Sequence, residues 1–265
     1  MKEITLGQYY PVDSPIHRLD PRTKLAGTII YIVALFVAEG PLAYLISAAF
    51  LLWMIHVSKV PLSYMMRGLK PILFILAFSA VFNLFLTDGA PIIKIWKLTI
   101  TWEGLLRAIY MTLRLVFLIM GSSLMTFTTT PNQLTDGLET GLAPLKKIKV
   151  PVHEIAMMMS IALRFIPILV DETDKITKAQ TARGADFENG KLIERVKNMI
   201  PLLVPLFISA FRRASDLAMA MEARCYQGGE GRTKMKPLHY TKLDRMGYAA
   251  LLGFLAVIIL LKIFL

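Results

Sequence analysis

Cysteine is almost absent from this sequence. The single cysteine, Cys225, excludes an internal disulfide framework. The sequence also lacks the Gly-x-x-x-x-Gly-Lys-Ser/Thr run that cradles nucleotide phosphates, and its nearest glycine-rich stretch, Gly228–Arg232, is expected to be a loop. ATP hydrolysis through that motif is therefore excluded for this chain.

Patterns typical of catalytic and metal sites are also missing. No two of the four histidines have the spacing of metal ligands, so neither a metal site nor a cofactor is expected. The acidic residues Asp171, Glu172 and Asp174 are expected to form a solvated helix face rather than a catalytic group. The first 24 residues contain no apolar core of a secretory signal, so a cleavable signal peptide is not expected.

Apolar residues, by contrast, are in excess. They make up 55% of the 265 residues, and the runs Leu42–Val57 and Pro71–Leu86 contain no charged residue other than a protonated His56. A helix needs roughly 20 residues to cross the hydrocarbon core of a bilayer. The sequence therefore predicts an all-α, polytopic membrane protein with about five spans, near residues 25–38, 42–57, 71–87, 105–127 and 246–265.

The first two of these segments are short and nearly continuous. Only the helix-breaking triplet Glu39-Gly40-Pro41 separates them. We interpret them as a tight helical hairpin, with one bent or re-entrant segment as the alternative.

The distribution of charge predicts the orientation. The formal net charge is +11, and lysines and arginines gather before residue 25 and between residues 58 and 70. The opposite loops hold only Lys94 and Lys97, which nearby acids offset. The positive-inside rule then places the N-terminus in the cytoplasm and the C-terminus outside. Three regions follow: four spans within 1–127, a cytoplasmic coupling-helix domain at 128–245, and a last span at 246–265.

The cytoplasmic block is unusual because it is both charged and apolar. In 152–181, Ile155, Met158, Ile166 and further apolar residues recur at three- and four-residue spacing, which indicates an amphipathic helix. A second such helix is predicted at about 195–224, bent early by its prolines, and a shorter one at about 131–142. Apolar stripes this wide must pack against each other, the bilayer or partner subunits.

Each long amphipathic helix ends in a small-Arg-small triplet. The first is Ala182, Arg183 and Gly184; the second is Ala223, Arg224 and Cys225. Small flanking side chains let the backbone of a partner approach, and the guanidinium can then bind a carboxylate with two hydrogen bonds. The alternative is that both are ordinary arginines favoured at helix C-termini by the macrodipole. The duplication favours two equivalent docking sites.

The chain resembles the transmembrane T component of energy-coupling factor (ECF) transporters, a family that includes the cobalt-transport permeases. The resemblance rests on both triplets and three runs: Gly-Gln-Tyr-Tyr at 7–10, Ser-Pro-Ile-His-Arg-Leu-Asp-Pro-Arg-Thr-Lys at 14–24, and Ala-Leu-Arg-Phe-Ile-Pro at 162–167. It implies a non-catalytic, multi-pass subunit of a bacterial cell membrane. Such a subunit joins two ATP-binding-cassette ATPases, identical or different, to a small membrane-embedded S component that binds a vitamin or transition-metal ion.

The resemblance also implies roles for single residues. Arg183 and Arg224 would be the arginines that insert into grooves on the two ATPases. Cys225 stands where glycine is the commoner family residue, and this exchange is tolerated if the position does not have a positive φ.

Three questions stay open at this point. An integral membrane enzyme with a cytoplasmic helical active site is the alternative function, and a stand-alone secondary transporter ranks last because the two halves are unlike. Arg114, deep in the fourth predicted span, is either a functional residue or a helix-packing partner. No nucleic-acid partner is expected.

Overall fold

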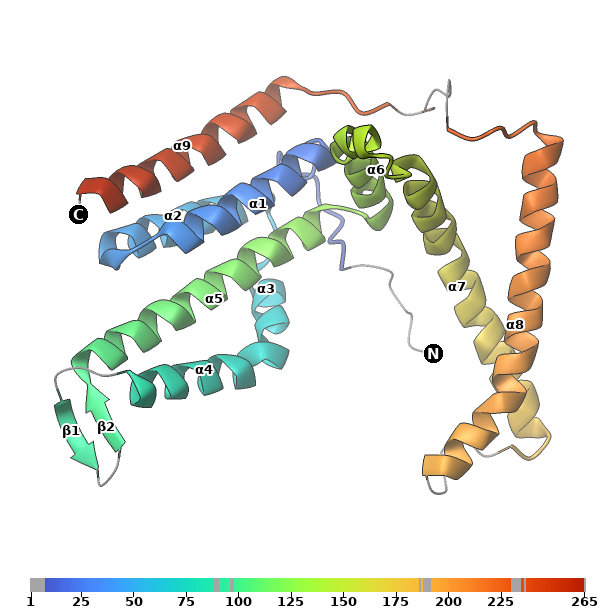
Figure 1. Ribbon diagram of the computed structural model, residues 1–265, viewed down its shortest axis with the longest axis horizontal. Coiled ribbons are helices and arrows are strands. Elements are labelled where there is room, and N and C mark those ends of the chain that lie inside the picture. The colour runs from blue at the N-terminus through green and yellow to red at the C-terminus, as the bar shows by residue number, and fades with distance from the viewer. Residues whose placement is uncertain are drawn as a thin grey trace. The chain divides into compact units, whose positions relative to one another are not determined.

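The chain is helical almost throughout. The computed structural model describes residues 8–87, 91–95, 98–185, 187, 192–229, 235 and 237–264. Within these ranges it forms nine α-helices, two short 3₁₀ helices at Lys70–Ile72 and Ala143–Ile148, and one β-hairpin (Figure 1). The α-helices and strands are α1 (Pro21–Val37), α2 (Gly40–Ser58), α3 (Leu62–Leu69), α4 (Leu73–Leu86), β1 (Pro91–Ile95), β2 (Leu98–Thr101), α5 (Trp102–Thr128), α6 (Pro131–Gly141), α7 (Val152–Ala182), α8 (Leu192–Ala223) and α9 (Lys242–Phe264).

Five described helices are long and apolar enough to cross a membrane, which confirms the predicted fold class. They are α2, the continuous stretch Leu62–Leu86, α5, α7 and α9. Two helices differ from the predicted set of membrane spans. Helix α1 has only 17 residues, and α7, predicted as cytoplasmic, meets the criterion through its apolar first half.

The predicted hairpin at the first two segments is present. Helix α1 ends at Val37 and α2 begins at Gly40, whose φ of +78° suits glycine. Pro41 then occupies the first turn of α2, where its missing N–H costs nothing. The segment is therefore two helices rather than one bent helix.

A β-hairpin not expected from the sequence joins α4 to α5. Its strands pair antiparallel, with Lys94 opposite Thr99. Thr101 ends the second strand and caps α5: its hydroxyl donates to the Thr87 carbonyl (2.8 Å) and accepts from the Gly104 N–H (3.1 Å). Three predicted features lie partly or wholly outside the described residues or side chains: Gly7 of the first run, the Lys94 and Lys97 side chains, and the glycine-rich stretch beyond Gly229.

The chain divides into two compact units by its contacts. One, the bundle unit, contains residues 8–141 together with 238–264, and the other, the lever unit, contains residues 142–237. The division predicted from the sequence followed membrane sides instead, so it is a different division of the same chain. Helix α6 belongs to the bundle unit, where it packs against α1.

The bundle unit is centred on α1. Ala34, Leu35 and Ala38 are completely buried, with α2, α5 and α9 packed around them. Tyr31 of α1 donates to the Phe117 carbonyl of α5, and Lys262 of α9 pairs with Glu39 (2.6 Å). At the other end of α1, Lys24 contacts Thr128 at the end of α5, and Asp20 contacts Asp244 at the start of α9. Helix α5 is therefore antiparallel to α1, and α9 is parallel to it. That alternation agrees with the directions expected from the predicted order of spans.

A polar cluster joins the starts of α1 and α9. It consists of the buried residues Asp20, Lys24 and Asp244 and the exposed Thr241. One Asp244 carboxylate oxygen accepts from the Asp20 N–H (2.8 Å), and the other accepts from the N–H and hydroxyl of Thr241, both at 2.7 Å. The Lys24 ammonium donates to the carbonyls of His17 (3.0 Å) and Thr128 (2.7 Å). Four chain segments therefore meet at these side chains.

The segment before α1 is held by its own histidine. One ring nitrogen of His17 lies 2.7 Å from the Ser14 hydroxyl, and the other lies 3.0 Å from the Tyr10 carbonyl. Burial lowers the pKa of His17. The neutral ring can accept from Ser14 and donate to Tyr10 at once.

Arg114 is a helix-packing residue. Its Nε donates to the Tyr44 hydroxyl (3.1 Å), and its terminal nitrogen donates to the Ala38 carbonyl (3.2 Å). Ala38 ends α1, so the cation also lies where the helix macrodipole is negative.

We expect Asp244→Ala to destabilise the bundle unit strongly. The substitution leaves the buried Asp20 N–H without an acceptor, at about 1–3 kcal/mol, and also removes two hydrogen bonds from Thr241. Thermal unfolding in detergent measures the loss. Asp13→Ala is the control, because Asp13 forms an exposed ion pair with Arg18, and exposed pairs contribute little to stability. Equal effects of the two substitutions would contradict the role of the cluster.

Gly137→Ala tests the close approach of α6 to α1. A Cβ at position 137 would lie 2.9 Å from Cβ and 3.3 Å from the carbonyl carbon of Pro21, neither of which can rotate away. We expect overpacking of about 1–3 kcal/mol to outweigh the gain in helix propensity. Gly141→Ala, on the same helix with nothing within 4 Å, should be neutral or stabilising in the same unfolding assay.

Candidate docking site at the ends of the long helices

Helices α7 and α8 pack against each other in opposite directions (Figure 1). Near the end of α7, the Gln180 amide donates to the Pro201 carbonyl near the start of α8 (3.4 Å). Glu172 pairs with Arg213 (2.9 Å), and at the other end Gly229 lies directly against the His153 ring. The C-terminus of each helix therefore lies near the N-terminus of the other.

The face of α7 that packs on α8 shares Leu169 with the predicted stripe but otherwise differs from it. Ile161, Phe165 and Leu169 face Ala210, Leu217 and neighbouring residues of α8 across a small apolar groove. Ile155, Met158 and Ile166 of the predicted stripe are exposed instead. On α8, Phe207 and Phe211 are also exposed, 60% and 72%. Much of the apolar surface of this unit therefore has no cover within the described chain.

The first triplet forms the C-terminal cap of α7. Arg183 is the cap residue, and Gly184 follows with a φ of +89°. The Gly184 N–H donates to the Thr181 carbonyl (2.9 Å), and the Ala185 N–H donates to the Gln180 carbonyl (3.0 Å). These are the two hydrogen bonds of a Schellman motif.

The second triplet forms the same cap at the end of α8. Cys225 follows Arg224 with a φ of +55°. Its N–H donates to the Glu222 carbonyl (2.9 Å), and the Tyr226 N–H donates to the Met221 carbonyl (3.1 Å). Arg224 therefore occupies the same backbone position as Arg183. The two triplets are equivalent in geometry as well as in sequence.

A side chain at position 225 is tolerated only if φ is not positive. Cys225 has a positive φ, so this condition is not met. A left-handed conformation costs a residue with a Cβ roughly 1–2 kcal/mol. The signal was available in the sequence: glycine is the usual residue after a helix cap, and the two triplets align Cys225 with Gly184. The hydrogen-bond pattern that forces this conformation is visible only in the structure.

Both arginines are free to meet a partner. Arg183 and Arg224 are exposed, and neither pairs with a carboxylate among the described residues. Because the helices are antiparallel, the caps lie at opposite ends of the pair. Helix α7 has 31 residues and is about 45 Å long, so the two guanidinium groups are separated by a distance of that order.

The described residues contain no cluster of metal ligands. No group of three His, Cys, Asp or Glu side chains among them could hold a metal ion. Within the acidic cluster, Glu172 is engaged by Arg213 between the helices, while Asp171 and Asp174 are exposed, as expected for a solvated face.

Replacement of Cys225 by glycine should stabilise the α8 cap. Glycine adopts a positive φ without steric cost, so we expect Cys225→Gly to gain about 1 kcal/mol. Cys225→Ser is the control, since it removes the thiol but keeps the Cβ. Hydrogen exchange of the amides of Cys225 and Tyr226 reports the cap directly. Equal protection in the glycine and serine variants would contradict strain at this position.

The sequence of this chain matches a protein family and several named proteins over nearly its whole length. The family model described as CbiQ, cobalt transport protein, matches residues 13–235. An energy-coupling factor transporter transmembrane protein EcfT of Clostridium kluyveri is 55% identical over 266 residues, covering 99% of this chain and 98% of the relative. Proteins of the same name from Thermosediminibacter oceani and Bacillus subtilis are 54% and 48% identical, covering 97% and 99% of both chains, respectively.

These matches span the bundle helices and both arginine caps. None of the three relatives is named as an enzyme, so the alternative of a membrane enzyme is not favoured. The chain belongs to the CbiQ family, as a transmembrane T component of the energy-coupling factor transporters.

Proposed function

We propose that this chain is the scaffold and coupling subunit of an ECF importer. It joins two ATP-binding-cassette ATPases to a small substrate-binding S component in the bacterial cell membrane. Arg183 and Arg224 are the docking residues, each with its small neighbours, Ala182 and Gly184 or Ala223 and Cys225. The S component determines the cargo, a vitamin or a transition-metal ion.

The equivalence of the two caps is the observation that carries this proposal. Identical Schellman motifs place an exposed arginine in the same position at the ends of both helices. Two separate ATPases require two equivalent contacts with space between them, and opposite ends of a helix about 45 Å long supply it. If the arginines served only to cap their own helices, the two caps would not have to be equivalent.

The uncovered apolar surface of the lever unit supports the rest of the assembly. Met158, Phe207 and Phe211 are well exposed on α7 and α8, and large exposed apolar patches mark sites of contact with proteins or membranes. We assign this surface to the S component and the bilayer. ATP-driven movement of the two caps would then reach the S component through the helices that bear them.

The orientation follows from the same proposal. The caps face the cytoplasm, where the ATPases hydrolyse ATP, so the N-terminus and the domain at 128–245 are cytoplasmic. Helix α9 then crosses once and ends outside. The parallel arrangement of α1 and α9 agrees with this order.

Loss of both arginines should abolish ATPase docking. A buried charged contact at an interface contributes about 2–5 kcal/mol, so each single Arg→Ala change should weaken binding on the order of 30-fold or more. Co-purification of the ATPases with Arg183→Ala, Arg224→Ala and the double variant measures the effect, together with uptake by the reconstituted complex.

Arg212→Ala is the matched control, because Arg212 is an exposed arginine on the body of α8. It should retain both ATPases. If the double variant also retains them and transports normally, the docking role is wrong. If the ATPases bind but uptake fails, the arginines transmit movement rather than hold the ATPases.

A further inference from the structure

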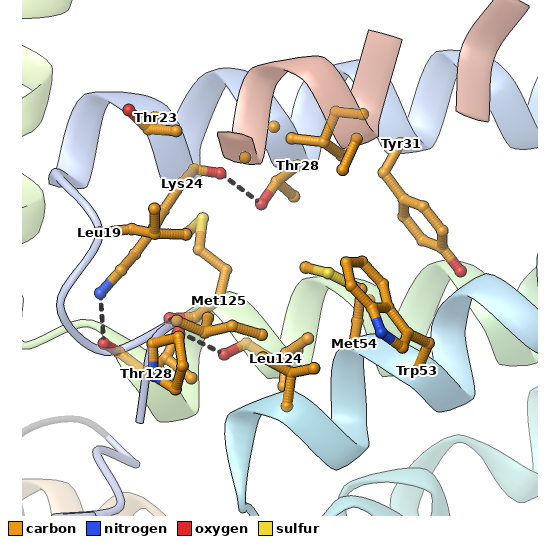
Figure 2. A pocket seen from close by; sticks show the side chains of 18 of the residues that line it. Leu19, Thr23, Lys24, Thr28, Tyr31, Trp53, Met54, Leu124, Met125 and Thr128 are labelled. Atoms are coloured by element: carbon orange, nitrogen blue, oxygen red, sulfur yellow. Dashed lines mark hydrogen bonds between the residues drawn. The ribbon is translucent and has the colours of Figure 1, made fainter. Parts of the chain in front are cut away.

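An apolar cavity lies inside the bundle unit, and no residue of either arginine cap lines it. It has a volume of about 310 Å³ and lies among α1, α2, α5 and α9. Figure 2 shows Thr28 and Tyr31 of α1 on one side, facing Met54 and Trp53 of α2 across the space. Its lining includes the exposed side chains of Trp53 (50%), Leu243 (37%) and Met246 (68%), so the cavity reaches the outer surface between α2 and α9.

Most polar side chains at its wall form hydrogen bonds within the chain, and the buried Thr23 hydroxyl is the exception. The Thr28 and Thr128 hydroxyls donate to the carbonyls of Lys24 and Leu124, each at 2.8 Å. The Tyr31 hydroxyl and the Lys24 ammonium also donate to backbone carbonyls. A water molecule needs two to four polar partners, and this wall offers few. The cavity therefore suits an apolar occupant.

The cavity lies among candidate membrane spans. Three of the four helices that line it, α2, α5 and α9, are candidate spans, which a bilayer would surround with hydrocarbon. An acyl chain is the apolar group present there at high concentration, and lipid tails are as apolar as leucine.

A basic residue lies one turn beyond the mouth. Lys242 begins α9 and precedes Met246 by four residues, which places the two side chains on the same side of the helix. Lys242 is exposed and forms no ion pair with the described acids, and the neighbouring Asp244 is already occupied by Asp20 and Thr241. The start of a membrane helix is the depth at which lipid phosphates lie.

We propose that the cavity holds one acyl chain of an anionic phospholipid whose phosphate is bound by Lys242. The lipid would fill the space between α2 and α9, two helices that otherwise meet mainly through the stacked rings of Phe50 and Phe254, 4.3 Å apart. The proposal is independent of the ATPase docking role, because no cap residue takes part in it.

Trp53 provides the readout. The full-length chain with Trp96→Phe and Trp102→Phe retains Trp53 as its single tryptophan. In nanodiscs of increasing brominated phospholipid content, we expect Trp53 quenching by phosphatidylglycerol to saturate at about five-fold lower mole fraction than by phosphatidylcholine, the preference that one basic residue gives. Quenching that follows the bulk lipid composition equally for both headgroups would overturn the proposal.

Two pairs of variants locate the acyl chain and the phosphate. Ala250→Phe fills the cavity and should remove the saturable component, whereas Ala249→Phe, exposed and outside the lining, should retain it. Lys242→Gln should remove the preference for phosphatidylglycerol, and Arg245→Gln, about 60° further from the lining residues, should leave it.

Thermal unfolding of each variant shows whether it has folded, and only folded variants are compared. Saturable quenching that survives Ala250→Phe would mean that the lipid binds elsewhere and would overturn the assignment. Loss of quenching only when an S component is added would show that a protein segment, not a lipid, occupies the cavity in the complex.

Discussion

The bundle depends on one buried arrangement of charge, the polar cluster that ties the start of α1 to the start of α9. The Asp244 carboxylate and the Lys24 ammonium are removed from water there, and both are satisfied by hydrogen bonds. Asp244 accepts from the N–H groups of Asp20 and Thr241, and Lys24 donates to the carbonyls of His17 and Thr128. Asp20 and Asp244 are more than 200 positions apart in the chain. The start of the last helix is thereby held beside the start of the first.

The lever unit is stabilised by different interactions. Among the described residues, its two helices are joined by apolar contacts, the Glu172–Arg213 ion pair and the hydrogen bond from Gln180 to the Pro201 carbonyl, while backbone hydrogen bonds form the cap at the C-terminus of each helix. A Schellman motif fixes the direction in which its cap residue leaves the helix, so the same motif used twice presents two arginines alike.

Much of this was predictable from local pattern. Long uncharged runs, the break at Glu39-Gly40-Pro41 and the prolines at helix starts predicted most helices to within a few residues. The exact start of α1 was missed because Asp20 caps it through a side-chain hydrogen bond to Arg22 N–H (2.9 Å). Periodicity identified α7 as amphipathic but not its buried face, since Ile161 and Phe165, rather than Ile155 and Met158, contact α8.

The sequence by itself determined the helical class, the breaks between helices and the duplicated triplets, because these follow from hydrophobicity, proline and glycine within a few neighbouring residues. Only the tertiary structure decided which groups meet. It paired Asp244 with Asp20 and Arg114 with Ala38, and enclosed the cavity beside Trp53. The reason is physical: burial and hydrogen-bond partners depend on contacts between distant segments, and no local pattern contains them.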